Sequence, residues 1–100
     1  MSIRLRIFEL QFDDSNTDEA AAHRVTPREI RQVLDNAPSF FRNKKKHKAP
    51  YVMIGKTYGG RMLTVPLART SDPSVWRPAT AFDSDSDEHA SYLADRGERQ

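Results

Sequence analysis

Residues 51–68, YVMIGKTYGGRMLTVPLA, contain two apolar runs separated by a pair of glycines. The second run places Leu63, Val65 and Leu67 at alternate positions. Alternation of this kind is typical of a strand with one buried face. Because the glycine turn at residues 58–60 is short, we expect the two runs to form a β-hairpin.

A helix is predicted upstream of this hairpin, over residues 26–36. Thr26 is a good N-cap, Pro27 stands where its missing N–H costs nothing, and Glu29 completes a capping box. Apolar residues then recur three and four positions apart, at Ile30, Val33, Leu34 and Ala37. This spacing gives the helix one apolar stripe that can pack on the hairpin.

The remaining segments complete an α+β pattern. We expect strands at 3–10, 39–42 and 75–82, a short helix over 19–23 capped by Asn16 or Thr17, and a last helix after residues 83–87 that stops at Gly97. The order β-α-α-β-β-β-β-α predicts helices packed on an antiparallel, meandering sheet. Pro66 and Pro78 remove ladder donors and are expected at an edge or a bulge. A single domain is expected over 1–97, with 98–100 as a frayed tail.

The composition excludes several functions. The chain has no cysteine, so it has no disulfide, thiol nucleophile or cysteine-based zinc site. The three histidines lie on different predicted elements, and there is no glycine-rich phosphate loop, so we expect neither a metal nor a cofactor. The absence of a signal peptide and of a long apolar run predicts a cytoplasmic protein without a membrane span.

The charge is strongly segregated along the chain. The net charge is only +2, yet residues 42–61 carry seven basic and no acidic side chains, and residues 83–100 are mainly acidic. The densest part is the loop between two predicted strands, with Arg42, Lys44, Lys45, Lys46, His47 and Lys48. Such a loop either binds a phosphate backbone or is simply solvated. The flanking Phe40, Phe41 and Tyr51 can offer a stacking face to a base.

Arg61 and Arg77 are the other candidates for phosphate binding. Each lies in or beside a predicted strand, where it needs either a phosphate or a carboxylate such as Glu29 or Glu88. Cleavage of RNA at the 2′-hydroxyl also needs proton transfer, for which Tyr51, Tyr58, His47 and Glu88 are candidates. A turn centred near residue 71.5 would pair Arg77 with Pro66 and Arg61 with Phe82, roughly 17 Å apart along the sheet. We therefore expect Arg77 to belong to the reactive site and Arg61 to lie closer to the rim of the turn.

Four segments together resemble the BrnT-like toxins, which are ribonuclease components of type II toxin–antitoxin pairs related in fold to RelE toxins. The segments are His23–Ile30, Tyr51–Thr57, Gly60–Val65 and Val75–Ala81. The chain departs from the family pattern at Arg24, where the family has glycine, at Phe82, where it has arginine, and in its acidic last helix.

The resemblance implies a RelE/BrnT-like fold and a metal-independent, RNA-cleaving toxin. Its catalytic candidates are Arg77, Arg61, Tyr51 and Glu88, and its partners are RNA and a cognate antitoxin, in a homodimer or a hetero-oligomer with the antitoxin. Two alternatives remain open. One is a non-catalytic domain that binds nucleic acid or an acidic protein partner, and the other is a structural module whose basic loop only confers solubility.

Overall fold

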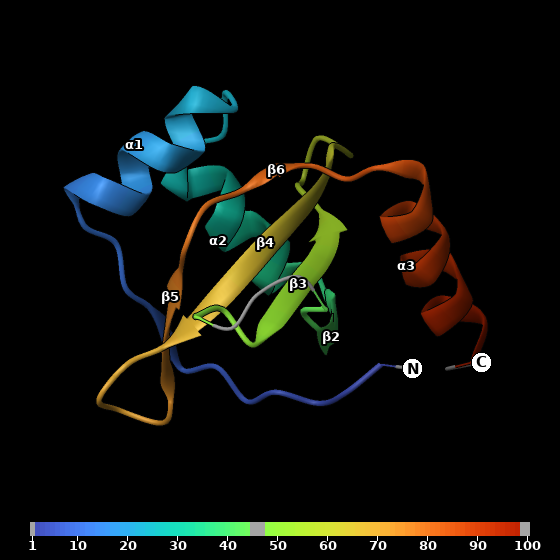
Figure 1. Ribbon diagram of the computed structural model, residues 1–100. Coiled ribbons are helices and arrows are strands. Elements are labelled where there is room, and N and C mark those ends of the chain that lie inside the picture. The colour runs from blue at the N-terminus through green and yellow to red at the C-terminus, as the bar shows by residue number, and fades with distance from the viewer. Residues whose placement is uncertain (1, 45–47, 99–100) are drawn as a thin grey trace.

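The computed structural model describes residues 2–44 and 48–98 (Figure 1). Within them lie six strands and three helices, in the order β1 (Glu9–Leu10), α1 (Asp14–Ala22), α2 (Pro27–Asp35), β2 (Ser39–Arg42), β3 (Tyr51–Lys56), β4 (Met62–Arg69), β5 (Val75–Pro78), β6 (Phe82–Asp83) and α3 (Ser86–Glu98). The α+β class is therefore confirmed.

The sheet is mixed rather than purely antiparallel. Its order is β1-β5-β4-β3-β2, with β6 pairing to β4 beside this path. Strands β2 to β5 form the predicted antiparallel meander, but β1 pairs parallel to β5. The chain between β1 and β5 includes two helices and three strands, which is long enough for the crossover that a parallel pair requires.

The hairpin and the capped helix both form as predicted. Strands β3 and β4 pair from Tyr51 with Leu67 to Lys56 with Met62, and Gly60 takes a φ of 91° in the turn. Helix α2 has Thr26 as its N-cap in a capping box with Glu29. Three residues of the α2 stripe, Ile30, Val33 and the half-buried Leu34, pack in the core, and Val33 lies close to Gly55 of β3. The fourth, Ala37, lies beyond the end of the helix and is exposed, so its place in the stripe was predicted wrongly.

The N-terminal expectation is wrong in two places. Only Glu9 and Leu10 of the predicted strand 3–10 form a ladder, while Ile3 makes an isolated bridge to Phe40 of β2. Residues 3–10 thus run from one edge strand of the sheet to the other, with the half-buried Leu5 packed against the core. The first helix begins earlier than predicted, because Asp13 rather than Asn16 or Thr17 caps it.

The predicted last strand is broken in two. Strand β5 ends at Pro78 and β6 begins at Phe82, and the register with β4 shifts by one residue between them. The Ala79 N–H donates to the Pro66 carbonyl oxygen. Because the nitrogen and the carbonyl of one strand residue point to the same side, the Pro66 nitrogen also faces the break between β5 and β6. The N–H that proline lacks would have no regular ladder partner there. The two prolines thus lie at an interruption of the ladder rather than inside a regular central pairing, which is what the expectation of an edge or a bulge requires.

The two faces of the sheet are covered by different helices. Gly55 of β3 lies against α2, and its neighbour Ile54 faces the opposite side of the sheet. Helix α3 covers that opposite side, where Ser39 of β2 donates a hydrogen bond to Asp95 of α3 (Figure 1). The sequence predicts an apolar stripe at Ala90, Leu93 and Ala94 for this helix, and that prediction is wrong, because Leu93 is 53% exposed and the buried contact is made by Tyr92. The expected stop at Gly97 is also wrong, since the helix continues to Glu98.

Candidate nucleic-acid interface

Arg61 lies at the centre of a polar cluster that joins distant parts of the chain. Its guanidinium donates to Asp83 at 2.7 Å and to Glu29 at 3.2 Å. It also donates to the carbonyl oxygens of Arg24 at 2.8 Å and His23 at 3.3 Å. The hydrogen bond that the Asp83 carboxylate accepts raises the pKa of Arg61. The sequence predicted either a phosphate or a carboxylate such as Glu29 as the partner of Arg61, and the structure has the carboxylate. Together these contacts use all three nitrogens of the guanidinium.

Arg77 is held by a carboxylate that the sequence did not indicate. Its Nε and Nη2 donate to the two carboxylate oxygens of Asp13 at 2.9 and 3.1 Å. This bidentate bond from Arg77 and the N–H of Asn16 lower the pKa of Asp13 to about 2. The N-cap of α1 is thereby tied to β5, and Arg77 carries a carboxylate in the position that a phosphate would occupy.

Tyr51 and Glu88 also have structural partners. The Tyr51 ring packs edge-on against Trp76 with centroids 5.6 Å apart, and its hydroxyl accepts from Arg69 at 3.5 Å. The Glu88 carboxylate accepts from the Asp85 N–H at 2.8 Å, and Asp85 accepts from the Glu88 N–H in return. Asp85 and Glu88 therefore form the capping box of α3.

The fold does not bring the four catalytic candidates together. Arg77 pairs with Ala68 rather than with Pro66, and Phe82 pairs with Thr64. Arg61 immediately precedes β4, so the two arginines are roughly 23 Å apart along the strand at about 3.3 Å per residue. Tyr51 pairs with Leu67, next to Ala68, and so lies on the opposite face of the sheet from Arg77.

The register differs from the prediction because side chains enlarge the turn between β4 and β5. Thr70 donates to the Val75 carbonyl at 2.7 Å and accepts from the Asp72 N–H at 3.1 Å. Asp72 accepts from both the N–H and the hydroxyl of Ser74. The last ladder pair is Arg69 with Trp76, which moves the centre of the turn by one residue.

A cluster of unpaired cations lies where β2 and β4 end and where β3 and β5 begin. Arg42, Lys44, Lys48 and Arg69 form this cluster, which we name the basic end, and all four are exposed. Among the residues that the structure describes, none of the four makes a salt bridge, in contrast to Arg61 and Arg77. The other predicted members of the loop, Lys45, Lys46 and His47, lie outside the described residues.

Aromatic side chains accompany the basic end on both faces of the sheet. Phe40 packs partly buried against the core, whereas Phe41 is half-buried on the other face beside Val52. On the core-facing side, the Arg69 guanidinium lies 5.2 Å from the Trp76 ring centre and 5.6 Å from that of Tyr51. Both rings hold Arg69 in place by cation–π attraction.

Sequence reasoning missed three cations near this end. Arg69 was passed over because it lies outside the basic loop, and only the pairing of β4 with β3, and of β3 with β2, carries it there. Arg4 and Arg6 are exposed on the N-terminal segment, which hydrogen-bonds to Phe40 at one side and to Ser74 at the other. A signal for these two was present, because they alternate with Ile3, Leu5 and Ile7 and must face away from the core.

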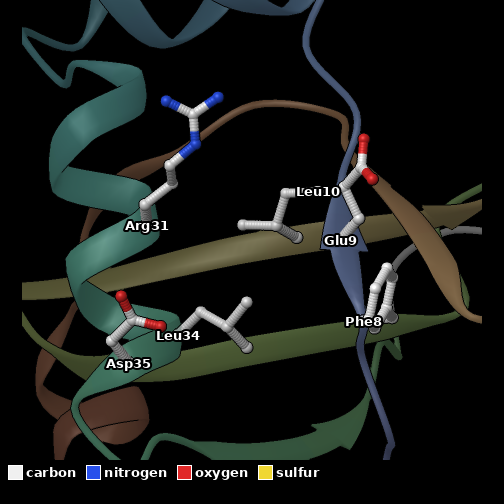
Figure 2. Close-up of a pocket in the computed structure, with 6 residues that line it drawn as sticks. All are labelled: Phe8, Glu9, Leu10, Arg31, Leu34 and Asp35. Carbon is white, nitrogen blue, oxygen red and sulfur yellow. The ribbon is translucent and has the colours of Figure 1, made fainter.

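A second region, between α2 and β1, contains a hollow of about 340 Å³ (Figure 2). Leu10 and Leu34 point into it, while Arg31, Glu9 and Asp35 lie around them, and Phe8 is 81% exposed. Two carboxylates against one guanidinium make this hollow unfavourable for phosphate.

No group of three or more histidines, aspartates or glutamates is arranged to hold a metal ion within 2–44 and 48–98. No helix in the same part of the chain is long and apolar enough to cross a membrane. Comparisons of the chain with protein-family models, with curated proteins and with solved structures found no match.

Proposed function

We propose that this protein binds single-stranded RNA at the basic end of its sheet. The main observation that supports RNA binding is a contrast between two groups of cations. Arg61 and Arg77 are neutralised by carboxylates, whereas Arg42, Lys44, Lys48 and Arg69 are gathered without a salt bridge among the described residues. Clustered cations repel one another, and a polyanion relieves that repulsion while releasing its own counterions.

The aromatic residues favour RNA over an acidic protein as the partner. Phe41 lies half-buried on the face away from the α2 core, next to the start of the basic loop. An aromatic ring beside cations is the arrangement by which single-stranded bases are stacked while their phosphates are neutralised. An acidic protein would use the cations but not the ring, so it is the second candidate.

Ribonuclease activity is the more demanding part of the toxin hypothesis and stays a prediction. One observation supports the resemblance to BrnT-like toxins. Arg24 takes a φ of 60°, a conformation that favours glycine, and glycine is the residue that the family has there. The dispersal of Arg61, Arg77, Tyr51 and Glu88 favours binding over catalysis.

The binding test is a titration of a fluorescent single-stranded RNA at several salt concentrations. Each phosphate contact contributes about 0.7 to the slope of log K against log salt for single strands. We expect the Lys44→Gln/Lys48→Gln variant to lower that slope by about 1.4 and to weaken binding. The Arg28→Gln/Lys56→Gln variant removes two exposed cations elsewhere, from α2 and the far end of β3, and serves as the matched control.

Equal effects of the two double variants would contradict the proposal. Melting temperatures of all variants should stay close to that of the wild type, because surface changes away from caps and core alter stability by about 0.5 kcal/mol or less. A gel of the same RNA after incubation tests cleavage. Cleavage by the wild type that is lost in a folded Arg77→Ala variant would establish the ribonuclease.

A further inference from the structure

The turn between β4 and β5 forms a small hollow at the basic end. It has a volume of about 170 Å³ and is lined by Arg69, Thr70, Ser71, Asp72, Pro73, Val75 and Trp76. At about 30 Å³ per water molecule this is space for roughly five or six waters. Pockets that enclose a whole small molecule usually have volumes of about 300 Å³ or more, so this hollow is too small for a whole nucleotide. A single flat heterocycle is a ligand of suitable size.

The hollow presents a cation and a carboxylate that do not bond to each other. Arg69 is held in place by Tyr51 and Trp76, and no salt bridge joins it to Asp72 within the described chain. Asp72 is fixed by the N–H and hydroxyl of Ser74, which both donate to its Oδ1 at 2.9 and 2.8 Å. A carboxylate has about four acceptor positions, so Oδ2 retains acceptor capacity for a ligand.

We infer that this hollow binds a guanine base of the RNA, an inference that rests on the RNA binding proposed above. Guanine displays two adjacent donors, N1–H and the N2 amino group, which suit the carboxylate of Asp72. It also displays the acceptors O6 and N7, which suit the guanidinium of Arg69. Uracil presents carbonyl oxygens on both sides of its single N–H, and these are repelled by a carboxylate. The basic end provides affinity for RNA of any sequence, and the hollow provides the preference for guanine over other bases.

Fluorescence titrations of the full-length protein with four RNA pentamers test this inference. The centre of an otherwise all-uridine pentamer is guanosine, inosine, adenosine or uridine. We expect the guanosine pentamer to bind at least about fivefold more tightly than the uridine pentamer, the lower end of the range for a bidentate contact. Inosine lacks only the N2 amino group, so it should lose most of that preference, because a site built for a donor rejects an analogue without it.

Asp72→Asn is the variant that isolates the site. Its side-chain oxygen can still accept from Ser74 and keep the turn, but it replaces one acceptor by a donor. We expect it to abolish the guanosine preference while leaving binding of the uridine pentamer unchanged or stronger. Asp18→Asn, on the exposed side of α1, removes the same charge far from the hollow and should retain the preference.

The outcomes separate this inference from the proposed function. Equal binding of all four pentamers, or a guanosine preference that survives in Asp72→Asn, would overturn the guanine site and leave RNA binding standing. Failure of every pentamer to bind would overturn both.

Discussion

Replacement of Arg61 by alanine should destabilise the protein, because this side chain joins three separate segments. Its guanidinium contacts Glu29 of α2, Asp83 of β6 and the carbonyl oxygens of His23 and Arg24 in the connection between the first two helices. The Asp83 side chain is 67% exposed, so that pair contributes little, as exposed ion pairs do. The better shielded contact is with Glu29, since the Arg61 and Glu29 side chains are 30% and 28% exposed, whereas the bonds to the two carbonyl oxygens are exposed.

Hydrogen bonds to charged groups contribute about 1.5–3 kcal/mol when shielded from water, and less when partly exposed. For the whole set we expect Arg61→Ala to lower the free energy of unfolding by about 2 kcal/mol. A domain of this size loses about 4–8 °C per kcal/mol, so the melting temperature should fall by about 8–16 °C. Arg61→Lys should recover only part of this loss, because an ammonium cannot reproduce the planar fork.

Thermal unfolding followed by circular dichroism measures these shifts. Arg28→Ala is the matched control, because Arg28 is an exposed arginine of α2 that makes no salt bridge among the described residues. If Arg61→Ala melted within 2 °C of the wild type, the structural role argued here would be refuted. Arg61 would then be available for a ligand, as the phosphate-binding alternative requires.

Three further changes test the fold. Thr26→Ala should cost about 1 kcal/mol in urea unfolding, because Thr26 accepts from the Glu29 N–H as the N-cap of α2, and no change would argue against the cap. Gly55→Ala should cost about 1–3 kcal/mol by overpacking, since its Cβ would lie 3.2 Å from a Val33 methyl; a variant as stable as the wild type would contradict this close approach. The pKa of Asp13 is lowered to about 2 from 3.8 by its bond from Arg77. The stability it contributes is therefore complete above about pH 4 and is lost as the pH falls toward 2. Titration of the Asp13 carboxyl by NMR should show this pKa, and Arg77→Gln should raise it toward 3.8.

Local elements whose causes lie within a few residues could be predicted from the sequence. The capping box at Thr26 and Glu29 and the glycine turn at Gly60 involve near neighbours along the chain, and both formed as expected. The strand alternation at Leu63, Val65 and Leu67 also predicted buried side chains, because a two-residue period is a property of the strand alone.

Which charges pair with one another depends on the way the chain folds, and no local pattern predicts it. Arg77 and Asp13 are 64 residues apart in the chain, and they meet because the parallel pairing of β1 with β5 carries the start of α1 beside β5. Arg69 reaches the basic end for a similar reason, because the β3–β4 register pairs Tyr51 with Leu67 and so carries the end of β4 beside the start of β3. An ion pair requires two charges to lie within about 4 Å, and neither charge carries local information about the other. The distinction between the arginines that bind carboxylates and the basic-end cations, which make no salt bridge among the described residues, therefore arises from chain topology and strand register.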